Sequence, residues 1–265
     1  MSKKENREEF TNFPRFLYKY RKIDKFTEDI FSRNRLYLPS PLEFNDPFDC
    51  RIEMSFDATE REQKKRFKEI LKDVRPESSR QERNALVKKL EKTGWIKNVI
   101  NKAEAITAKM INGLRVLCLS AKNNDLLMWS HYAHNHEGFC LKFDVAKNPG
   151  VLGNSKPVIY SEKYPFPNFF KTPTEEITDM VLMTKAKEWK YEEEYRFIPK
   201  HYKQYKYWNF QESLVGIIFG CQIKKEAEDY LISLLEKYNH RVTIYHSIIG
   251  KQKFALDILP AMTIK

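Results

Sequence analysis

Glu192, Glu194 and Arg196 stand at alternate positions of the segment KEWKYEEEYRFIP and could form a catalytic group. If this segment is a strand, its period of two places the three side chains on one face. Two carboxylates so close repel each other, so the pKa of one rises unless a cation such as Arg196 compensates. Such a pair can stabilise an oxocarbenium-like centre while its second member orients a nucleophile. The alternative interpretation is a solvated, charged edge strand.

A second group lies between residues 115 and 143, where Ser, His, Trp and Tyr are concentrated. The spacing of His131, His134 and His136 suggests zinc, but no spaced cysteine or carboxylate completes a ligand set. We therefore predict no metal site. We expect His131 or Tyr132 to contact a polar substrate, with a helix cap or a core hydrogen bond as the alternative.

A third group is a run of basic and aromatic residues between positions 185 and 208. Stacking faces beside phosphate-binding charges are typical of proteins that bind single-stranded nucleic acid. A basic surface over half-buried aromatic rings gives the same pattern. The members are Lys185, Lys187, Lys190, Arg196, Lys200, Lys203, Lys206, Tyr191, Tyr195, Tyr202, Tyr205, Tyr207 and Trp208.

Hydrophobic periodicity predicts the elements that position these groups. Asp125 is expected to cap a short helix that delivers Ser130, His131 and Tyr132, between strands ending at Ser120 and starting at Phe139. The segment around Asn45-Asp46-Pro47 is predicted to be a tight turn, held by Phe44 and Phe48 or lining a pocket. The other expected strands cover 16–20, 35–39, 157–160, 191–198, 214–219, 242–249 and 254–258, with helices over 27–34, 224–238 and from 174 toward 189.

Residues 59–112 differ in character, because they are rich in Lys, Glu and Arg with apolar residues at helical spacing. Two or three amphipathic helices are predicted there. Because the strands elsewhere do not alternate regularly with helices, we predict an α+β fold with mixed or antiparallel small sheets. The expected organisation is a single domain over 1–265 with a helical insertion at 59–112.

Composition limits the classes of protein to which the chain can belong. A chain of 265 residues with 42% hydrophobic residues can bury a core, which excludes wholesale disorder. The net charge of +11 favours acidic partners such as nucleic acid, nucleotides or anionic lipid. Its four cysteines are far apart, so a disulfide framework is not expected. Without a secretory signal or a bilayer-spanning run, the expectation is a cytoplasmic protein with no membrane partner.

Four short motifs together resemble a bacterial family catalogued as domain of unknown function 2971. The resemblance extends from about Phe16 to Ile249 and depends on the order of the motifs. They are FNDPFD at 44–49, CLS at 118–120, MWSHY at 128–132 with Gly138, and KEWKYEEEYR at 187–196.

The opening segment FLYKYRKIDKFTEDIFSRNRLYL is similar to the start of ADP-ribosyltransferase-like folds. Such enzymes carry a polar or basic residue on the first strand, a Ser at a later strand end and a Glu, often as E-x-E, further on. Ser120 and Glu192-x-Glu194 match by type and order, and Lys19 and Arg21 are the nearest first-strand candidates. The chain has no first-strand His and has Ser120-Ala121-Lys122 where S-T-S is usual.

This resemblance implies a bacterial effector that consumes NAD, in phage defence or a toxin system, with a protein or nucleic acid as acceptor. Glu194 would hydrogen-bond the nicotinamide ribose and Glu192 would orient the acceptor, with His131 as a further catalytic residue. The implied NAD-binding residues are Tyr18, Lys19, Arg21, Asn45, Asp46, Ser120, Trp129, Tyr132 and Arg196. Two alternatives stay open: a nucleic-acid-binding module using the 185–208 run, and a metal-dependent nuclease using Asp46, Asp49 and Glu192.

Overall fold

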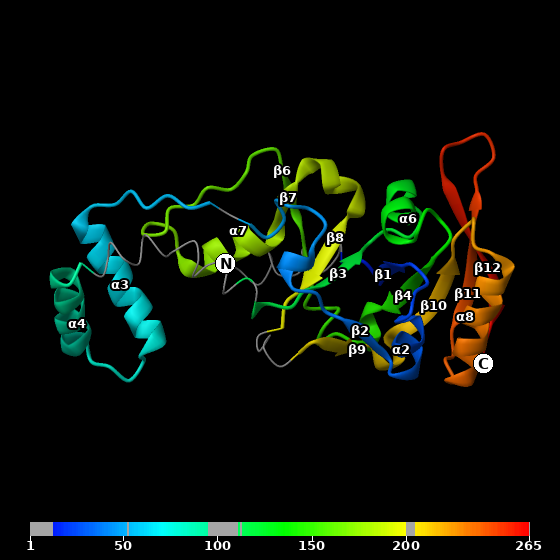
Figure 1. Ribbon diagram of the computed structural model, residues 1–265, viewed down its shortest axis with the longest axis horizontal. Coiled ribbons are helices and arrows are strands. Elements are labelled where there is room, and N and C mark those ends of the chain that lie inside the picture. The colour runs from blue at the N-terminus through cyan, green and yellow to red at the C-terminus, as the bar shows by residue number, and fades with distance from the viewer. Residues whose placement is uncertain (1–12, 52, 95–110, 112, 200–204, 265) are drawn as a thin grey trace. The chain divides into compact units, whose positions relative to one another are not determined.

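The computed structural model describes residues 13–51, 53–94, 111, 113–199 and 205–264 (Figure 1). Its internal contacts divide the chain into two compact units. We call the first the sheet unit, which comprises Met1–Pro39, Arg115–Val158 and Glu188–Lys265. The second is the helical unit, which comprises Ser40–Leu114 and Ile159–Lys187. Helices and strands occur together as predicted, so the α+β class is confirmed.

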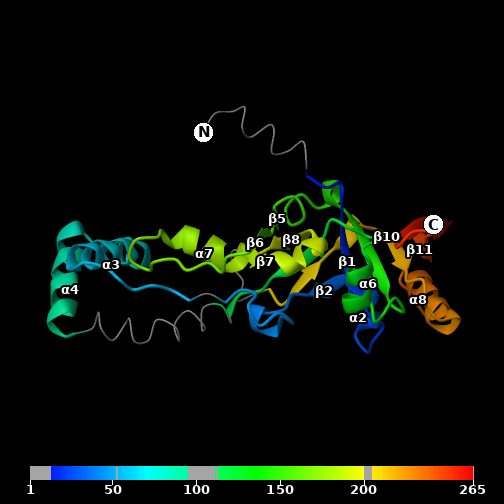
Figure 2. The same cartoon turned by 90° about the horizontal axis from the view of Figure 1, so that it is seen from above.

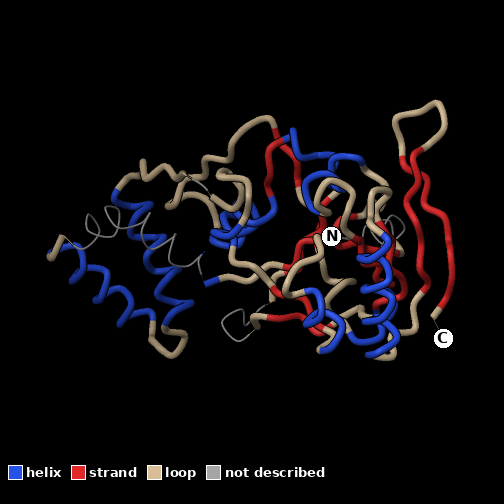
Figure 3. Tube along the Cα trace, turned by 45° about the vertical axis from the view of Figure 1, so that its right-hand side comes forward, coloured by secondary structure: helices blue, strands red, loops and turns tan. Residues whose placement is uncertain are grey.

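The sheet unit is built on eight strands in the order β12-β11-β10-β4-β1-β3-β8-β5. Neighbouring strands are antiparallel except β10 and β11, which run parallel, so the sheet is mixed. Figure 3 shows β11 and β12 as two long strands joined by a loop. The strands are β1 (Phe16–Arg21), β3 (Leu117–Ser120), β4 (Phe139–Asp144), β5 (Lys156–Pro157), β8 (Glu194–Phe197), β10 (Leu214–Phe219), β11 (Thr243–Ile249) and β12 (Leu256–Thr263).

The remaining elements of the sheet unit pack on the two faces of this sheet or connect its strands. Strands β2 and β9 form a separate antiparallel pair. Short 3-10 turns lead into β8 and β10 and out of β4. The full set of helices, strands and 3-10 turns outside the main sheet is α2 (Thr27–Ser32), β2 (Arg35–Tyr37), α6 (Leu126–Tyr132), η3 (Val145–Lys147), η4 (Lys187–Glu192), β9 (Tyr207–Asn209), η6 (Gln211–Ser213) and α8 (Lys225–Lys237).

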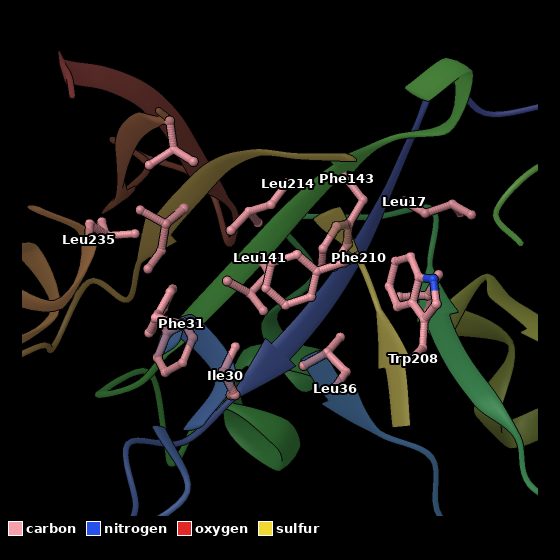
Figure 4. Packing of buried hydrophobic residues seen from close by; sticks show 14 of the residues in the cluster. Leu17, Ile30, Phe31, Leu36, Leu141, Phe143, Trp208, Phe210, Leu214 and Leu235 are labelled. Atoms are coloured by element: carbon pink, nitrogen blue, oxygen red, sulfur yellow. The ribbon is translucent and has the colours of Figure 1, made fainter. Parts of the chain in front are cut away.

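Alternation along the central strands divides the apolar residues between two faces. Leu17 and Leu141 point to the face covered by α2 and α8, where the larger core lies (Figures 1 and 4). Tyr18, Tyr20 and Cys140 point to the opposite face, where they pack with residues of α6. Figure 2 shows α6 beside β1. We call this second face the α6 face. The candidate site described below lies on it.

Most of the predicted elements of the sheet unit are confirmed, with boundaries shifted by at most three residues. The strand predicted at 254–258 instead runs from Leu256 to Thr263, and the one predicted at 157–160 is divided between β5 and a separate strand, Ile159–Ser161. Asp125 caps α6 by accepting hydrogen bonds from the amides of Leu127 (3.0 Å) and Met128 (3.1 Å). The main sheet is larger than the small sheets predicted, because β10, β11 and β12 join the central strands. Alternation within one strand does not show which distant strand will pair with it.

The helical unit contains α3 (Glu60–Val74) and α4 (Arg80–Lys92), which lie within the segment 59–112 where helices were predicted. Both begin at capping boxes, Thr59 with Glu62 and Ser79 with Glu82. Residues 95–110 and 112 of that segment lie outside the described residues. The other elements are η2 (Pro41–Glu43), β6 (Ile159–Ser161), α7 (Thr174–Met183) and β7 (Thr184–Ala186).

Two details of the helical unit differ from the sequence predictions. The helix that begins at Thr174 ends at Met183 and does not continue toward Trp189, because Thr184–Ala186 pairs with β6 in a parallel ladder. The turn after Asn45 forms as predicted, with the amide of Asp49 donating to the carbonyl of Asp46 (3.2 Å). Phe48, however, is 66% exposed and does not anchor this turn.

Two glycines of the sheet unit allow backbone segments to approach closely. A Cβ at Gly138 would lie 2.3 Å from the carbonyl oxygen of Arg21, and one at Gly220 would lie 2.0 Å from that of His136. The amide of Gly220 also donates to the carbonyl of Gly138 (2.9 Å). The end of β10 therefore packs against the turn between α6 and β4 only without side chains at these positions.

We predict that Gly220→Ala lowers the free energy of unfolding by roughly 1–3 kcal/mol, because the added methyl group forces backbone segments apart. The matched control is Gly150→Ala, where the added Cβ meets no atom within 4 Å. The control should change stability by less than about 0.5 kcal/mol. Urea denaturation of the three proteins measures both effects, and equal stability of both variants would contradict the close approach.

Candidate active site

A row of polar side chains crosses the α6 face of the sheet, one from each of several neighbouring strands. Tyr18 on β1 is the direct register partner of Ser120 on β3, and Ser120 is the partner of Glu194 on β8. On the other side of Tyr18, its partner on β4 is Lys142. Directly opposed residues in a sheet point to the same face. The fold therefore brings the first-strand Tyr18, Ser120 and Glu194 together, although they are far apart in the sequence.

Glu194 forms a buried ion pair with Arg196, two residues along the same strand. Arg196 Nε donates to Glu194 Oε1 (2.8 Å) and Nη2 donates to Oε2 (2.9 Å). The two residues are 6% and 1% exposed, so the alternative of a solvated edge strand is wrong here. A planar guanidinium held by both carboxylate oxygens fixes the position of Glu194 and favours its charged form.

Glu192 is close to Glu194 but is not on the strand, which corrects the prediction of a continuous strand over 191–198. It ends the 3-10 turn η4, and β8 begins only after Glu193. Glu193 has a left-handed backbone (φ 40°), which interrupts the alternation. Its exposed side chain pairs with Lys122 (2.9 Å).

Glu192 is nevertheless buried, at 3% exposure, and is tied to α6 and β3. The hydroxyl of Tyr132 donates to Glu192 Oε1 (2.7 Å). The hydroxyl of Ser120 donates to the backbone carbonyl of Glu192 (2.6 Å). Ser120 therefore fixes the backbone beside the two carboxylates, and Tyr132 orients one of them.

Two cationic residues of β1 also lie in this region of the sheet unit. Lys19 Nζ donates to the carbonyl of Cys118 (2.8 Å). Burial lowers the pKa of Lys19, while the nearby thiol of Cys118 and the charges of Glu194 and Glu192 partly oppose this effect. Burial likewise lowers the pKa of Arg21. Its Nε is buried without a hydrogen-bond partner in the described structure.

The residues of α6 have two different environments. Trp129 is fully buried, donates from its indole nitrogen to the carbonyl of Asn123 (2.9 Å) and packs edge-on against Tyr20 (5.2 Å). It is therefore a core residue of this face. His131 is exposed, with Nδ1 3.0 Å from the hydroxyl of Tyr191 and its ring against that of Trp189.

Asn45 and Asp46, also predicted to bind NAD, belong to the helical unit, whereas the other predicted site residues belong to the sheet unit. Asn45 is exposed, and Asp46 is buried and accepts from the amide of Phe48 (2.9 Å). The nuclease group is divided in the same way, since Asp49 pairs with Lys185 (3.6 Å) inside the helical unit. No group of three or more metal-ligating side chains occurs within the described parts of the chain.

The run of basic and aromatic residues does not form a uniform surface. Lys185 and Arg196 are buried in ion pairs, and Trp208 is part of the main core. Tyr205 and Tyr207 are exposed. Lys200, Tyr202 and Lys203 lie outside the described residues.

Sequence reasoning missed Lys142, which continues the polar row onto β4. A signal was present, because Lys142 is the one cation in the apolar strand FCLKFD. It also missed that Tyr132 orients Glu192, a pairing between residues 60 positions apart.

Residues 128–197 match the model of the family described as Protein of unknown function (DUF2971). No curated protein and no solved structure matches the chain. The matched segment agrees with the resemblance seen in the motifs, and it contains Tyr132, Glu192, Glu194 and Arg196. Among the described residues, no helix is long and apolar enough to cross a membrane. The chain is thus similar to a family without an assigned activity.

We predict that Tyr132→Phe lowers the free energy of unfolding by roughly 1.5–3 kcal/mol, because it removes a hydrogen bond to a buried carboxylate. Tyr230→Phe is the matched control, since Tyr230 is 39% exposed on α8. The control should change stability by at most about 0.5 kcal/mol. Chemical denaturation near neutral pH measures the free energy of unfolding of both variants. A Tyr132→Phe variant as stable as wild type would show that Glu192 does not need this donor.

The pKa of Tyr18 predicts a dependence of stability on alkaline pH. Burial, together with Cys140 and Tyr245, raises this pKa from 10.0 to about 12, while a hydrogen bond with the side chain of Asn123 lowers it in part. Because the folded pKa is the higher one, the neutral phenol stabilises the fold fully below pH 10.0. That contribution is lost as pH rises toward about 12. Denaturation of wild type and Tyr18→Phe between these pH values should show that the free energy of unfolding falls more steeply with pH in wild type. The same pH dependence in both proteins would refute the raised pKa of Tyr18.

Proposed function

We propose that the sheet unit is the catalytic part of an ADP-ribosyltransferase-like enzyme that uses NAD as a substrate. The observation that carries the proposal is the register of Tyr18, Ser120 and Glu194 on three neighbouring strands. Ser120 and Glu194 are the strand-end Ser and the E-x-E Glu of the resemblance. Tyr18, which was expected to line the NAD site, stands beside them in place of Lys19 or Arg21, the first-strand candidates of the resemblance. The role in phage defence or a toxin system is part of the same proposal.

The burial of both carboxylates supports a chemical role for this group. Glu192 and Glu194 are each less than a tenth exposed, which strengthens their electrostatic interactions with any bound cationic centre. Arg196 keeps Glu194 charged and oriented, and a carboxylate with two oxygens can accept further hydrogen bonds. Glu194 can therefore accept from a ribose hydroxyl while positive charge develops on the sugar.

The proposed reaction replaces one bond at the ribose carbon with another. The glycosidic bond breaks and nicotinamide leaves with the bonding electron pair, which neutralises its ring nitrogen. The electron-deficient ribose carbon then forms a bond to the acceptor nucleophile, and Glu192 orients that nucleophile and takes its proton. Tyr132 positions Glu192, and Ser120 holds the intervening backbone. His131, exposed beside Tyr191, is the further polar group at the C-terminal end of α6.

The rival proposal, a nucleic-acid-binding module using the 185–208 run, has less support. Lys185 and Arg196 are engaged in buried ion pairs and Trp208 packs in the main core, so these three members do not contribute to a continuous basic and aromatic surface.

We expect Glu192→Gln and Glu194→Gln to lower NAD turnover on the order of 10²–10³-fold, because each removes one preorganised charge. Nicotinamide release in the presence of cell extract is the measurement. The control is Glu193→Gln, which changes the exposed glutamate between them and should retain activity.

Glu194→Gln leaves Arg196 buried without its carboxylate and should also lose roughly 3–5 kcal/mol of stability. Turnover is therefore compared at a temperature where circular dichroism shows each variant folded. Full turnover in a folded Glu194→Gln, or no NAD consumption by wild type, would refute the enzyme proposal.

A further inference from the structure

Lys142 is a half-buried cation in the middle of β4, on the same sheet face as Glu194. Its register partners are Tyr18 on β1 and Gly216 on β10. Its neighbours along the strand, Leu141 and Phe143, are fully buried on the opposite face. A lysine is unusual in this environment, so its contacts decide whether it has a structural role or a binding role.

The ammonium group of Lys142 lies between two aromatic rings. Nζ is 4.2 Å from the ring centre of Phe16 and 4.7 Å from that of Tyr245, and it lies 3.1 Å from the Tyr245 hydroxyl. A second cation, the guanidinium of the exposed Arg15, lies 4.9 Å from the same Phe16 ring. This part of the α6 face therefore concentrates two positive charges around one ring.

In the described residues, no carboxylate forms an ion pair with either cation. Asp144, the next acidic residue of β4, instead accepts a hydrogen bond from the amide of Ala146 (3.0 Å). Contacts with aromatic rings compensate only part of the cost of removing an ammonium group from water. A half-buried cation with ring contacts and no anion retains the capacity to bind one.

Gly216 makes this arrangement possible. A Cβ at this position would lie 3.0 Å from the Tyr245 ring and 3.3 Å from Cδ of Lys142. Without a side chain there, the ring of Tyr245 can lie across β10 and reach the lysine on β4. The cluster thus combines residues of three strands and depends on one missing side chain.

We propose that Lys142, Tyr245 and Phe16 form an anion subsite that binds a phosphate group of a nucleotide. The lysine supplies a positive charge, and the Tyr245 hydroxyl supplies a hydrogen-bond donor. Three strand spacings of about 4.8 Å separate Lys142 from Glu194, or about 14 Å between their backbones. That the phosphate belongs to the substrate of the Glu194 site rests on the proposed function, whereas phosphate binding itself does not.

Isothermal titration calorimetry with ADP, inorganic pyrophosphate and adenosine tests the subsite without any turnover. Wild type should bind ADP and pyrophosphate but bind adenosine more weakly, because adenosine lacks the anion. Lys142→Met should weaken ADP binding by about tenfold or more, the loss expected for one charge-assisted contact. Lys147→Met, which removes an exposed lysine from η3, is the control for net charge and should bind normally.

Two further variants separate binding from folding. Lys142→Arg keeps the charge and the ring contacts, so its affinity for ADP should be within a few-fold of that of wild type. This variant tests the proposal even if Lys142→Met proves unstable. Tyr245→Phe keeps the ring and removes only the hydroxyl, so its loss of affinity should be smaller than that of Lys142→Met. Equal ADP affinity in wild type and a folded Lys142→Met, or no binding of either phosphate compound to wild type, would overturn the proposal.

Glu194→Gln distinguishes this proposal from the enzymatic one. At a temperature where circular dichroism shows it folded, it should still bind ADP like wild type, because Glu194 is three strands away from Lys142. Phosphate binding that depends on Lys142 in a protein that never consumes NAD would support the subsite and refute the transferase. NAD turnover that is unaffected in Lys142→Met, together with unchanged ADP affinity, would refute the subsite alone.

Discussion

The buried ion pair between Arg196 and Glu194 is the interaction on which the organisation of the polar region depends. Removing two charges from water is costly, and their attraction offsets this cost only when the geometry is close and other hydrogen bonds are satisfied. The two short bonds from the guanidinium to the carboxylate provide this close geometry.

Other polar residues lie near this pair. On the face where β8 places its charges, the adjacent strand β3 presents Ser120, and β1 beyond it presents Tyr18. Tyr132 then reaches Glu192 from α6, and the hydroxyl of Ser120 holds the Glu192 backbone. The result is a connected polar group with apolar packing from Trp129 and Tyr20 beside it. Such preorganised groups suit chemistry on charged intermediates better than they suit stability alone.

Local signals in the sequence were sufficient for many elements. The cap at Asp125, the alternation in β1 and the apolar runs of β4 and β10 depend on neighbouring residues only, so they could be predicted. Three details could not be predicted in this way. Glu193 adopts a left-handed backbone, Thr184–Ala186 leaves the helix to pair with β6, and β10 to β12 extend the central sheet. Each depends on partners distant in the chain.

By itself, the sequence determined the α+β class, most of the element positions and the residue types that could act together, because helix caps and hydrophobic periodicity are local. It also identified the E-x-E motif and Ser120 through their resemblance to known motifs. Only the tertiary structure decided that Tyr18, Ser120 and Glu194 are register partners and that Arg196 is buried against Glu194. It likewise decided that Lys142 lies between Phe16 and Tyr245. The reason is physical: strand register and burial arise from contacts between residues far apart in the chain, such as Lys142 and Tyr245, which are 103 positions apart, and no local pattern encodes such contacts.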